Sequence, residues 1–174
     1  MIPVTPTKIV CIGRNYLAHA RELGNELPPE PLIFLKPPSA LLAPGQPIVL
    51  PPQSRQVEYE GEIGVVVLER LKGVSVAQAE RARLGFTCVN DVTARDLQKS
   101  DGQWSRAKGF DTFCPVGPAV VEGLDWRSLE VRTMSGAAPN PQQLRLPLWV
   151  VLAAAFVVYL SRRARAALVR SAPS

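Results

Sequence analysis

The chain has 174 residues, of which 47% are hydrophobic and 20% are charged, and its formal net charge is +5. This composition is typical of a globular protein and excludes a disordered chain, while the length suits one domain with a core better than two. The positive excess lies entirely in residues 134–174, because residues 1–133 hold 15 basic and 15 acidic side chains. A neutral body without a basic stripe or an aromatic stacking platform argues against nucleic-acid binding.

The three cysteines, Cys11, Cys88 and Cys114, are far apart and form no CxxC pair. This spacing favours reduced thiols that act as small core residues over a disulfide or zinc framework. The N-terminus lacks the charged region, apolar run and cleavage site of a signal peptide. We therefore expect a cytoplasmic protein.

Hydrophobic patterning predicts a strand-rich α+β fold with a few short helices. Seventeen prolines favour turns and edge strands over long helices. In chain order, the predicted elements are strand 8–13, helix 15–24, strands 32–36, 47–51 and 57–67, helix 75–85, a strand that turns into a helix around Asp91, and extended segments 113–123 and 129–133. The segment 47–51 is predicted as an edge strand because prolines flank it.

The strand VEYEGEIGVVV places three carboxylates on one face. Side chains alternate along a strand, so Glu58, Glu60 and Glu62 share one face, while Val57, Tyr59, Ile63 and Val65 point to the other, toward the core. Carboxylates roughly 6 to 7 Å apart repel each other, which favours a bound cation. Asp91 at the end of the next apolar strand could add a third hard oxygen donor for Mg²⁺, Mn²⁺ or Ca²⁺. The alternative is an exposed edge with solvated charges.

Five segments resemble the fumarylacetoacetate hydrolase family and occur in the order found there: CIGRNYLAHARELG, PLIFLKP, EYEGEIGVVV, GFTCVNDVTARDLQ and WSRAKGFDTFCPVGP. The family includes acylpyruvate hydrolases, oxaloacetate decarboxylases and homoprotocatechuate-pathway isomerases, which take part in the catabolism of aromatic compounds. The resemblance covers residues 8–133. It implies a mixed β-sandwich or roll with short peripheral helices, incomplete here, and a first domain at 1–133.

The resemblance also implies roles for individual residues. Glu60, Glu62 and Asp91 match the family's ligands for a divalent cation, usually magnesium, and Glu58 falls outside that set. His19 and Glu22 match a histidine–glutamate pair one helical turn apart, in which the carboxylate would orient the imidazole. Lys108 matches the active-site lysine. Four further residues are expected to bind substrate carboxylates or support the site: Arg14, Tyr16, Lys36 and Arg95.

The function that follows from the resemblance is metal-dependent hydrolysis of C–C bonds in small 2-oxo or 1,3-dicarbonyl acids. The metal and Lys108 would meet the charge of an enolate, and His19 would activate water. Isomerisation or decarboxylation of the same substrates is the alternative. Intact relatives are expected to be homodimers.

Residues 134–174 depart from the family pattern, which continues past Thr133 with further strands and a TGTP-type segment. Their apolar and arginine-rich composition suggests a frame-shifted or truncated product. A membrane anchor is the alternative, although the 15-residue apolar run 146–160 is below the roughly 17 to 25 residues that span a bilayer. Without the missing segments, we expect unpaired sheet edges, and either slow turnover or a catalytically inactive fragment that at most binds metal.

Overall fold

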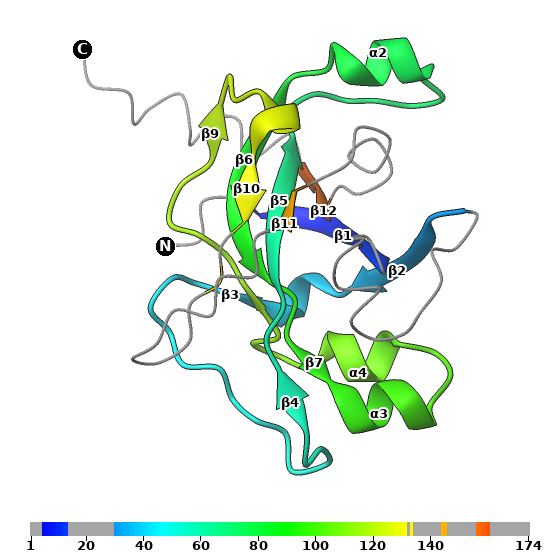
Figure 1. The fold of residues 1–174 in the computed structure, drawn as a ribbon, viewed down its shortest axis with the longest axis vertical. Helices are drawn as coiled ribbons and strands as arrows, with labels where there is room; N and C mark the ends of the chain where they lie inside the picture. Colours follow the sequence, from blue (N-terminus) through cyan, green and yellow to red (C-terminus); the bar gives the residue numbers. More distant parts are fainter. Residues whose placement is uncertain (1–4, 14–29, 132, 134–143, 146–155, 161–174) are drawn as a thin grey trace.

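A computed structural model describes residues 5–13, 30–131, 133, 144–145 and 156–160 of the chain (Figure 1). Its strands are β1 (Pro6–Gly13), β2 (Leu32–Lys36), β3 (Leu41–Leu42), β4 (Val57–Glu58), β5 (Gly61–Val67), β6 (Leu84–Asn90), β7 (Thr93–Ala94), β8 (Cys114–Pro115), β9 (Val121–Glu122), β10 (Glu130–Val131), β11 (Leu144–Arg145) and β12 (Phe156–Leu160). Strands outnumber helices, and the helices are short. The predicted α+β, strand-rich class is confirmed.

The main sheet has six strands in the order β2-β1-β12-β5-β6-β9. Its longest ladder is the antiparallel pair β5–β6, which runs from Gly61 opposite Asn90 to Val67 opposite Leu84. Three small two-stranded sheets, β3–β8, β4–β7 and β10–β11, lie around it. The pairing of β4 with β7 continues the β5–β6 hairpin beyond the main sheet and brings Glu58 opposite Thr93.

Strand β12 lies in the interior of the main sheet. It runs antiparallel to β1, with Pro6 opposite Leu160, and parallel to β5, with Phe156 opposite Gly64. The expectation of unpaired edges is therefore wrong for β1 and β5, because a strand from the divergent tail pairs with both. The rest of the apolar run lies outside the described residues. Within the part of the chain that is described, no helix is long and apolar enough to cross a membrane.

The core lies on both faces of the main sheet. One cluster packs Ile9 and Cys11 of β1 against Val66 and Val89, and a second packs Val65 and Phe86 against Trp126. A third cluster consists of Val92, Ala94 and Phe113, and Val92 and Ala94 follow β6 in the chain.

The alternation predicted for the glutamate strand holds in part. Val65 is buried, and Val57 and Ile63 pack against core clusters. Tyr59, which was expected to face the core, is instead 48% exposed. It lies in the short break between β4 and β5, where the regular alternation of a single strand does not continue.

The helices are 3-10 helix η1 (Pro38–Ala40), α2 (Val76–Glu80), α3 (Arg95–Ser100), α4 (Ser105–Gly109) and 3-10 helix η2 (Trp126–Ser128). Helix α2 begins at a capping box formed by Ser75 and Gln78, but it ends earlier than predicted because the chain enters β6 at Leu84. Figure 1 shows α3 and α4 side by side at one end of the molecule and α2 at the other. The predicted helix 15–24 lies outside the described residues.

The predicted edge strand 47–51 is wrong, since this segment joins no sheet in the structure. Pro47 and Pro51 have no N–H to donate to a ladder. The backbone N–H of Val49 instead donates to Thr112 Oγ1 at 2.9 Å.

Candidate active site

Five charged side chains from separate elements meet at one end of the β5–β6 hairpin and form what we call the ion-pair cluster: Lys36, Glu60, Asp91, Arg95 and Lys108. Lys36 ends β2, Glu60 immediately precedes β5, and Asp91 immediately follows β6. Arg95 begins α3, and Lys108 lies in the last turn of α4. The hairpin holds the two carboxylates together, because the backbone N–H of Asp91 donates to the carbonyl of Glu60 at 2.8 Å.

Lys108 is at the centre of the ion-pair cluster. Its Nζ lies 2.6 Å from Asp91 Oδ2 and 3.1 Å from Glu60 Oε2, and only 3% of its side chain is exposed. The same ammonium lies 5.1 Å from the centre of the Phe34 ring. Burial lowers the pKa of Lys108, but Asp91 and Glu60 raise it by more than burial lowers it. The net pKa of Lys108 is therefore above the ordinary value. Lys108 is thus a cation at neutral pH.

Lys36 holds the other oxygen of Asp91. Its Nζ donates to Asp91 Oδ1 at 2.6 Å and to the carbonyl of Val92 at 3.1 Å. The side chain of Lys36 is fully buried. Lys36 therefore contacts protein groups within the core and holds Asp91 in place. Its role in substrate binding or in support of the site stays a prediction.

Arg95 is engaged by protein carboxylates in the same way. Its Nη2 lies 2.5 Å from Glu60 Oε1, its Nε lies 2.9 Å from Glu58 Oε2, and its Nη1 donates to Gln98 Oε1 at 2.5 Å. Burial raises the pKa of Glu60, but Lys108 and Arg95 lower it, so the net pKa lies below the ordinary value. Glu60 is an anion at neutral pH, and Arg95 fixes its orientation.

Sequence reasoning missed two residues that complete the ion-pair cluster. Thr93 Oγ1 donates to Glu60 Oε1 at 3.0 Å and lies two residues after Asp91, where strand alternation would have placed it on the same side. Phe34 lies two residues before Lys36 on β2, and the same alternation could have identified it. Neither residue carries charge, so neither was singled out by its chemistry.

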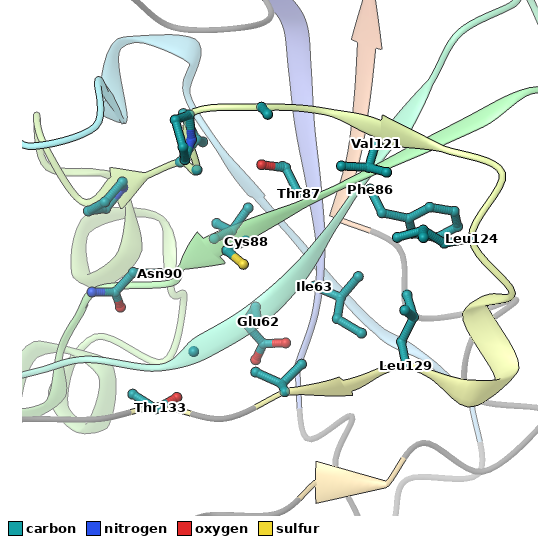
Figure 2. A pocket seen from close by; sticks show the side chains of 18 residues that line it. Glu62, Ile63, Phe86, Thr87, Cys88, Asn90, Val121, Leu124, Leu129 and Thr133 are labelled. Carbon is teal, nitrogen blue, oxygen red and sulfur yellow. The ribbon is translucent and has the colours of Figure 1, made fainter. Parts of the chain in front are cut away.

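Glu62 lies in a different setting from Glu60. It lines a pocket of about 710 Å³ with Gly61 and Asn90, whereas Glu60, Asp91 and Lys108 do not line it. Figure 2 shows Glu62, Asn90 and Thr133 toward one end of this pocket and Phe86, Leu124 and Leu129 toward the other. The lining is largely apolar, and the pocket adjoins the ion-pair cluster through Asn90, whose Oδ1 accepts from the Glu60 backbone N–H at 3.0 Å.

Four of the predicted site residues, Arg14, Tyr16, His19 and Glu22, lie outside the described residues. Their roles stay predictions. In the described part of the chain, the structure brings together Lys36, Glu60, Asp91, Arg95 and Lys108.

The described side chains include no group of three or more His, Cys, Asp or Glu that could hold a metal ion. The donor chemistry nevertheless suits a hard divalent cation, because oxygens of Glu60 and Asp91 already converge on one cationic nitrogen. That nitrogen is Lys108 Nζ, so an ammonium lies where these two carboxylates meet.

Comparison with known proteins places the chain in a family. Residues 8–165 match the family model for the fumarylacetoacetate hydrolase C-terminal region. The chain is 48% identical over 128 residues to protein MJ1656 of Methanocaldococcus jannaschii, covering 74% of this chain and 54% of that protein. It is 46% identical over 124 residues to the mitochondrial oxaloacetate tautomerase FAHD2A of Bos taurus, covering 70% of this chain and 40% of that protein.

The fold is similar to that of a solved structure, the 2-hydroxyhepta-2,4-diene-1,7-dioate isomerase from Mycobacterium marinum. The two match with a TM-score of 0.72 and 48% sequence identity over 82% of this chain and 52% of that chain. The chain belongs to the fumarylacetoacetate hydrolase family. It spans about half the length of the relatives it matches.

Proposed function

We propose that the chain binds a small 2-oxo or 1,3-dicarbonyl acid with a divalent cation and stabilises the enolate of that acid. The observation that carries this proposal is the buried Lys108 ammonium between Glu60 and Asp91. A cation in a site with little water stabilises developing negative charge far more than the same cation in water.

Glu60 and Asp91 would hold the cation, with Glu62 as the third donor that the family resemblance implies. When bound, a divalent cation such as Mg²⁺ would supply Lewis-acid polarisation of the substrate carbonyl. Lys36 and Arg95 orient the two carboxylates, since each contacts the oxygen that Lys108 does not. Lys108 would then offer its positive charge to the enolate oxygen.

C–C hydrolysis and isomerisation both pass through such an enolate. Hydrolysis further requires a base that activates water, for which His19 is the predicted residue. Isomerisation or tautomerisation requires only the movement of a proton. Two of the three similar proteins named above are a tautomerase and an isomerase, and this favours proton transfer as the second candidate reaction.

Turnover of acylpyruvates, oxaloacetate and hydroxyheptadienedioate with Mg²⁺ tests the proposal, with release of cleavage products monitored separately from keto–enol conversion. We expect Lys108→Met to lose on the order of a hundredfold in rate, the scale on which removal of one charge-stabilising group acts. The matched control is Lys99→Met, since Lys99 lies exposed on α3. Equal turnover by Lys108→Met and Lys99→Met would contradict the proposed role.

A further inference from the structure

The charges of the ion-pair cluster, taken together with that of Glu58, are balanced before any metal ion is added. Among the described residues, Lys36, Arg95 and Lys108 face the carboxylates of Glu58, Glu60 and Asp91. A divalent cation bound at Glu60 and Asp91 would leave an excess of two positive charges, or of one if Glu62 also turned toward it. Uncompensated charge in a site with little water is costly. Release of one of the three cations from its carboxylates would relieve part of this excess when a metal ion binds.

The contacts of the three cations indicate which one leaves. Lys36 is fully buried and also donates to the Val92 carbonyl, so it is held on two sides. Arg95 touches only one oxygen of Glu60 and is also bonded to Glu58 and Gln98. Lys108 alone among these three contacts both Glu60 and Asp91, and it does so through one flexible side chain.

The Lys108 ammonium also has a partner that is not a carboxylate, because it already lies over the Phe34 ring. Its Nζ is 5.1 Å from the Phe34 ring centre, and the face of an aromatic ring attracts a cation. The Phe34 ring packs edge-on against Trp104 with centroids 5.4 Å apart. Trp104 in turn packs tightly on Gly13, where an added Cβ would lie 2.4 Å from its ring. This aromatic pair is therefore held firmly beside the lysine.

We propose that Lys108 and a divalent cation compete for Glu60 and Asp91, so that metal binding displaces the ammonium toward Phe34. Lys108 thus occupies the site in the absence of metal and sets the concentration of metal needed to fill it. This inference rests on the proposed function, because it takes Glu60 and Asp91 as ligands of a divalent cation.

Titration of the full chain with Mn²⁺, with free Mn²⁺ followed by its electron paramagnetic resonance signal, tests the competition. We expect Lys108→Met to bind Mn²⁺ about tenfold or more tighter than the parent, since the competing charge is gone. Lys108→Arg keeps the charge and should bind like the parent, as should the distant control Lys99→Met. Far-ultraviolet circular dichroism of each variant reports whether it is folded.

Three results would overturn the competition, and they differ in what else they affect. If the parent binds Mn²⁺ and folded Lys108→Met binds it no tighter, the competition is wrong and the proposed metal site stands. If Lys108→Arg gains as much affinity as Lys108→Met, loss of charge is not the cause and the competition is again wrong. If neither the parent nor any folded variant binds Mn²⁺, the metal-dependent function fails as well.

Discussion

Lys36 Nζ lies 2.6 Å from Asp91 Oδ1, and this contact joins the last residue of β2 to the residue that follows β6 inside the core. The lysine side chain has no exposed surface, and that of Asp91 is 6% exposed. A buried ion pair of this kind adds little net stability over an apolar pair, but loss of one partner leaves the other charge uncompensated.

We expect Lys36→Met to destabilise the fold by about 3 kcal/mol, the lower end of the range for breaking a buried pair, because Asp91 keeps its contact with Lys108. Urea unfolding followed by circular dichroism measures the change. Lys99→Met, which removes an exposed lysine from α3, should leave the free energy of unfolding nearly unchanged. Similar decreases in the free energy of unfolding of both variants would show that the buried Lys36–Asp91 pair matters no more to stability than an exposed lysine does.

Thr87 and Thr93 are both buried, and we expect their replacement by valine to change the stability of the fold in opposite directions. Thr87 Oγ1 finds no hydrogen-bond partner among the described residues, whereas Thr93 Oγ1 lies within hydrogen-bond distance of two acceptors, Glu60 Oε1 and the Asp91 carbonyl, and can donate its one proton to either. Thr87→Val should therefore stabilise the fold by about 1 kcal/mol, and Thr93→Val should destabilise it by about 1 to 3 kcal/mol. Thermal and urea unfolding give both values, and a loss of stability in Thr87→Val would reveal a partner for its hydroxyl.

The three cysteines should differ in reactivity at neutral pH. Cys88 is exposed, whereas Cys11 and Cys114 are buried. Burial raises the pKa of Cys114 to about 12 and raises that of Cys11 further, so neither forms a thiolate at neutral pH. Iodoacetamide labelling followed by peptide mass mapping should find Cys88 modified in the native protein and all three modified in urea. Native labelling of Cys114 at the rate of Cys88 would contradict the packing of β3 on β8.

Asp96 ties the loop before β4 to the start of α3. Its carboxylate accepts from Ser54 Oγ at 2.5 Å and from the backbone N–H groups of Arg55 and Leu97 at 2.8 and 2.9 Å. The hydrogen bond from Ser54, followed by that from Arg55, holds the pKa of Asp96 below its ordinary value of 3.8. A lowered folded-state pKa means that the stabilisation is present above 3.8 and is lost as pH falls through the folded-state pKa.

Asp96→Asn should consequently reduce the free energy of unfolding at neutral pH. Because the variant lacks the carboxylate that is protonated in acid, its free energy of unfolding should differ less between neutral and acidic pH than that of the parent. Acid titrations of the parent and the variant, followed by circular dichroism, measure this difference. Asp111→Asn is the control, since Asp111 is exposed. A pH dependence in Asp96→Asn equal to that of the parent would assign the acid sensitivity to other carboxylates.

The sequence predicted those parts of the fold and site that depend on local pattern or on motif. The β5 and β6 strands follow from apolar runs, and the family resemblance assigned Glu60, Glu62, Asp91 and Lys108 to one site. In the structure Lys108 contacts Glu60 and Asp91, whereas Glu62 lines the neighbouring pocket. The pairing of Arg95 with Glu58 and Glu60 could not be predicted, because it depends on the register of β4 against β7 rather than on spacing along the chain.

The position of the last strand was equally beyond local pattern. The residues of β12 read as part of an apolar run, but nothing in that run specifies β1 and β5 as its neighbours. The break at Tyr59 likewise depends on where the chain leaves one sheet for another. Both features are set by long-range packing, which single-sequence periodicity does not report.

The interior position of β12 also governs when the main sheet can be completed during synthesis. Ribosomes deliver β1 and β2 first and the β5–β6 hairpin next, and each of these pairs can form as soon as it emerges. The β1–β2 pair and the β5–β6 hairpin can join into one sheet only after residue 160 has left the ribosome, since β12 lies between β1 and β5. Contacts between residues so distant in sequence carry a large loop-closure cost and slow folding. A nascent chain therefore exposes the facing edges of β1 and β5 from the time β5 emerges until β12 has emerged, and those edges are where binding by chaperones or aggregation would begin.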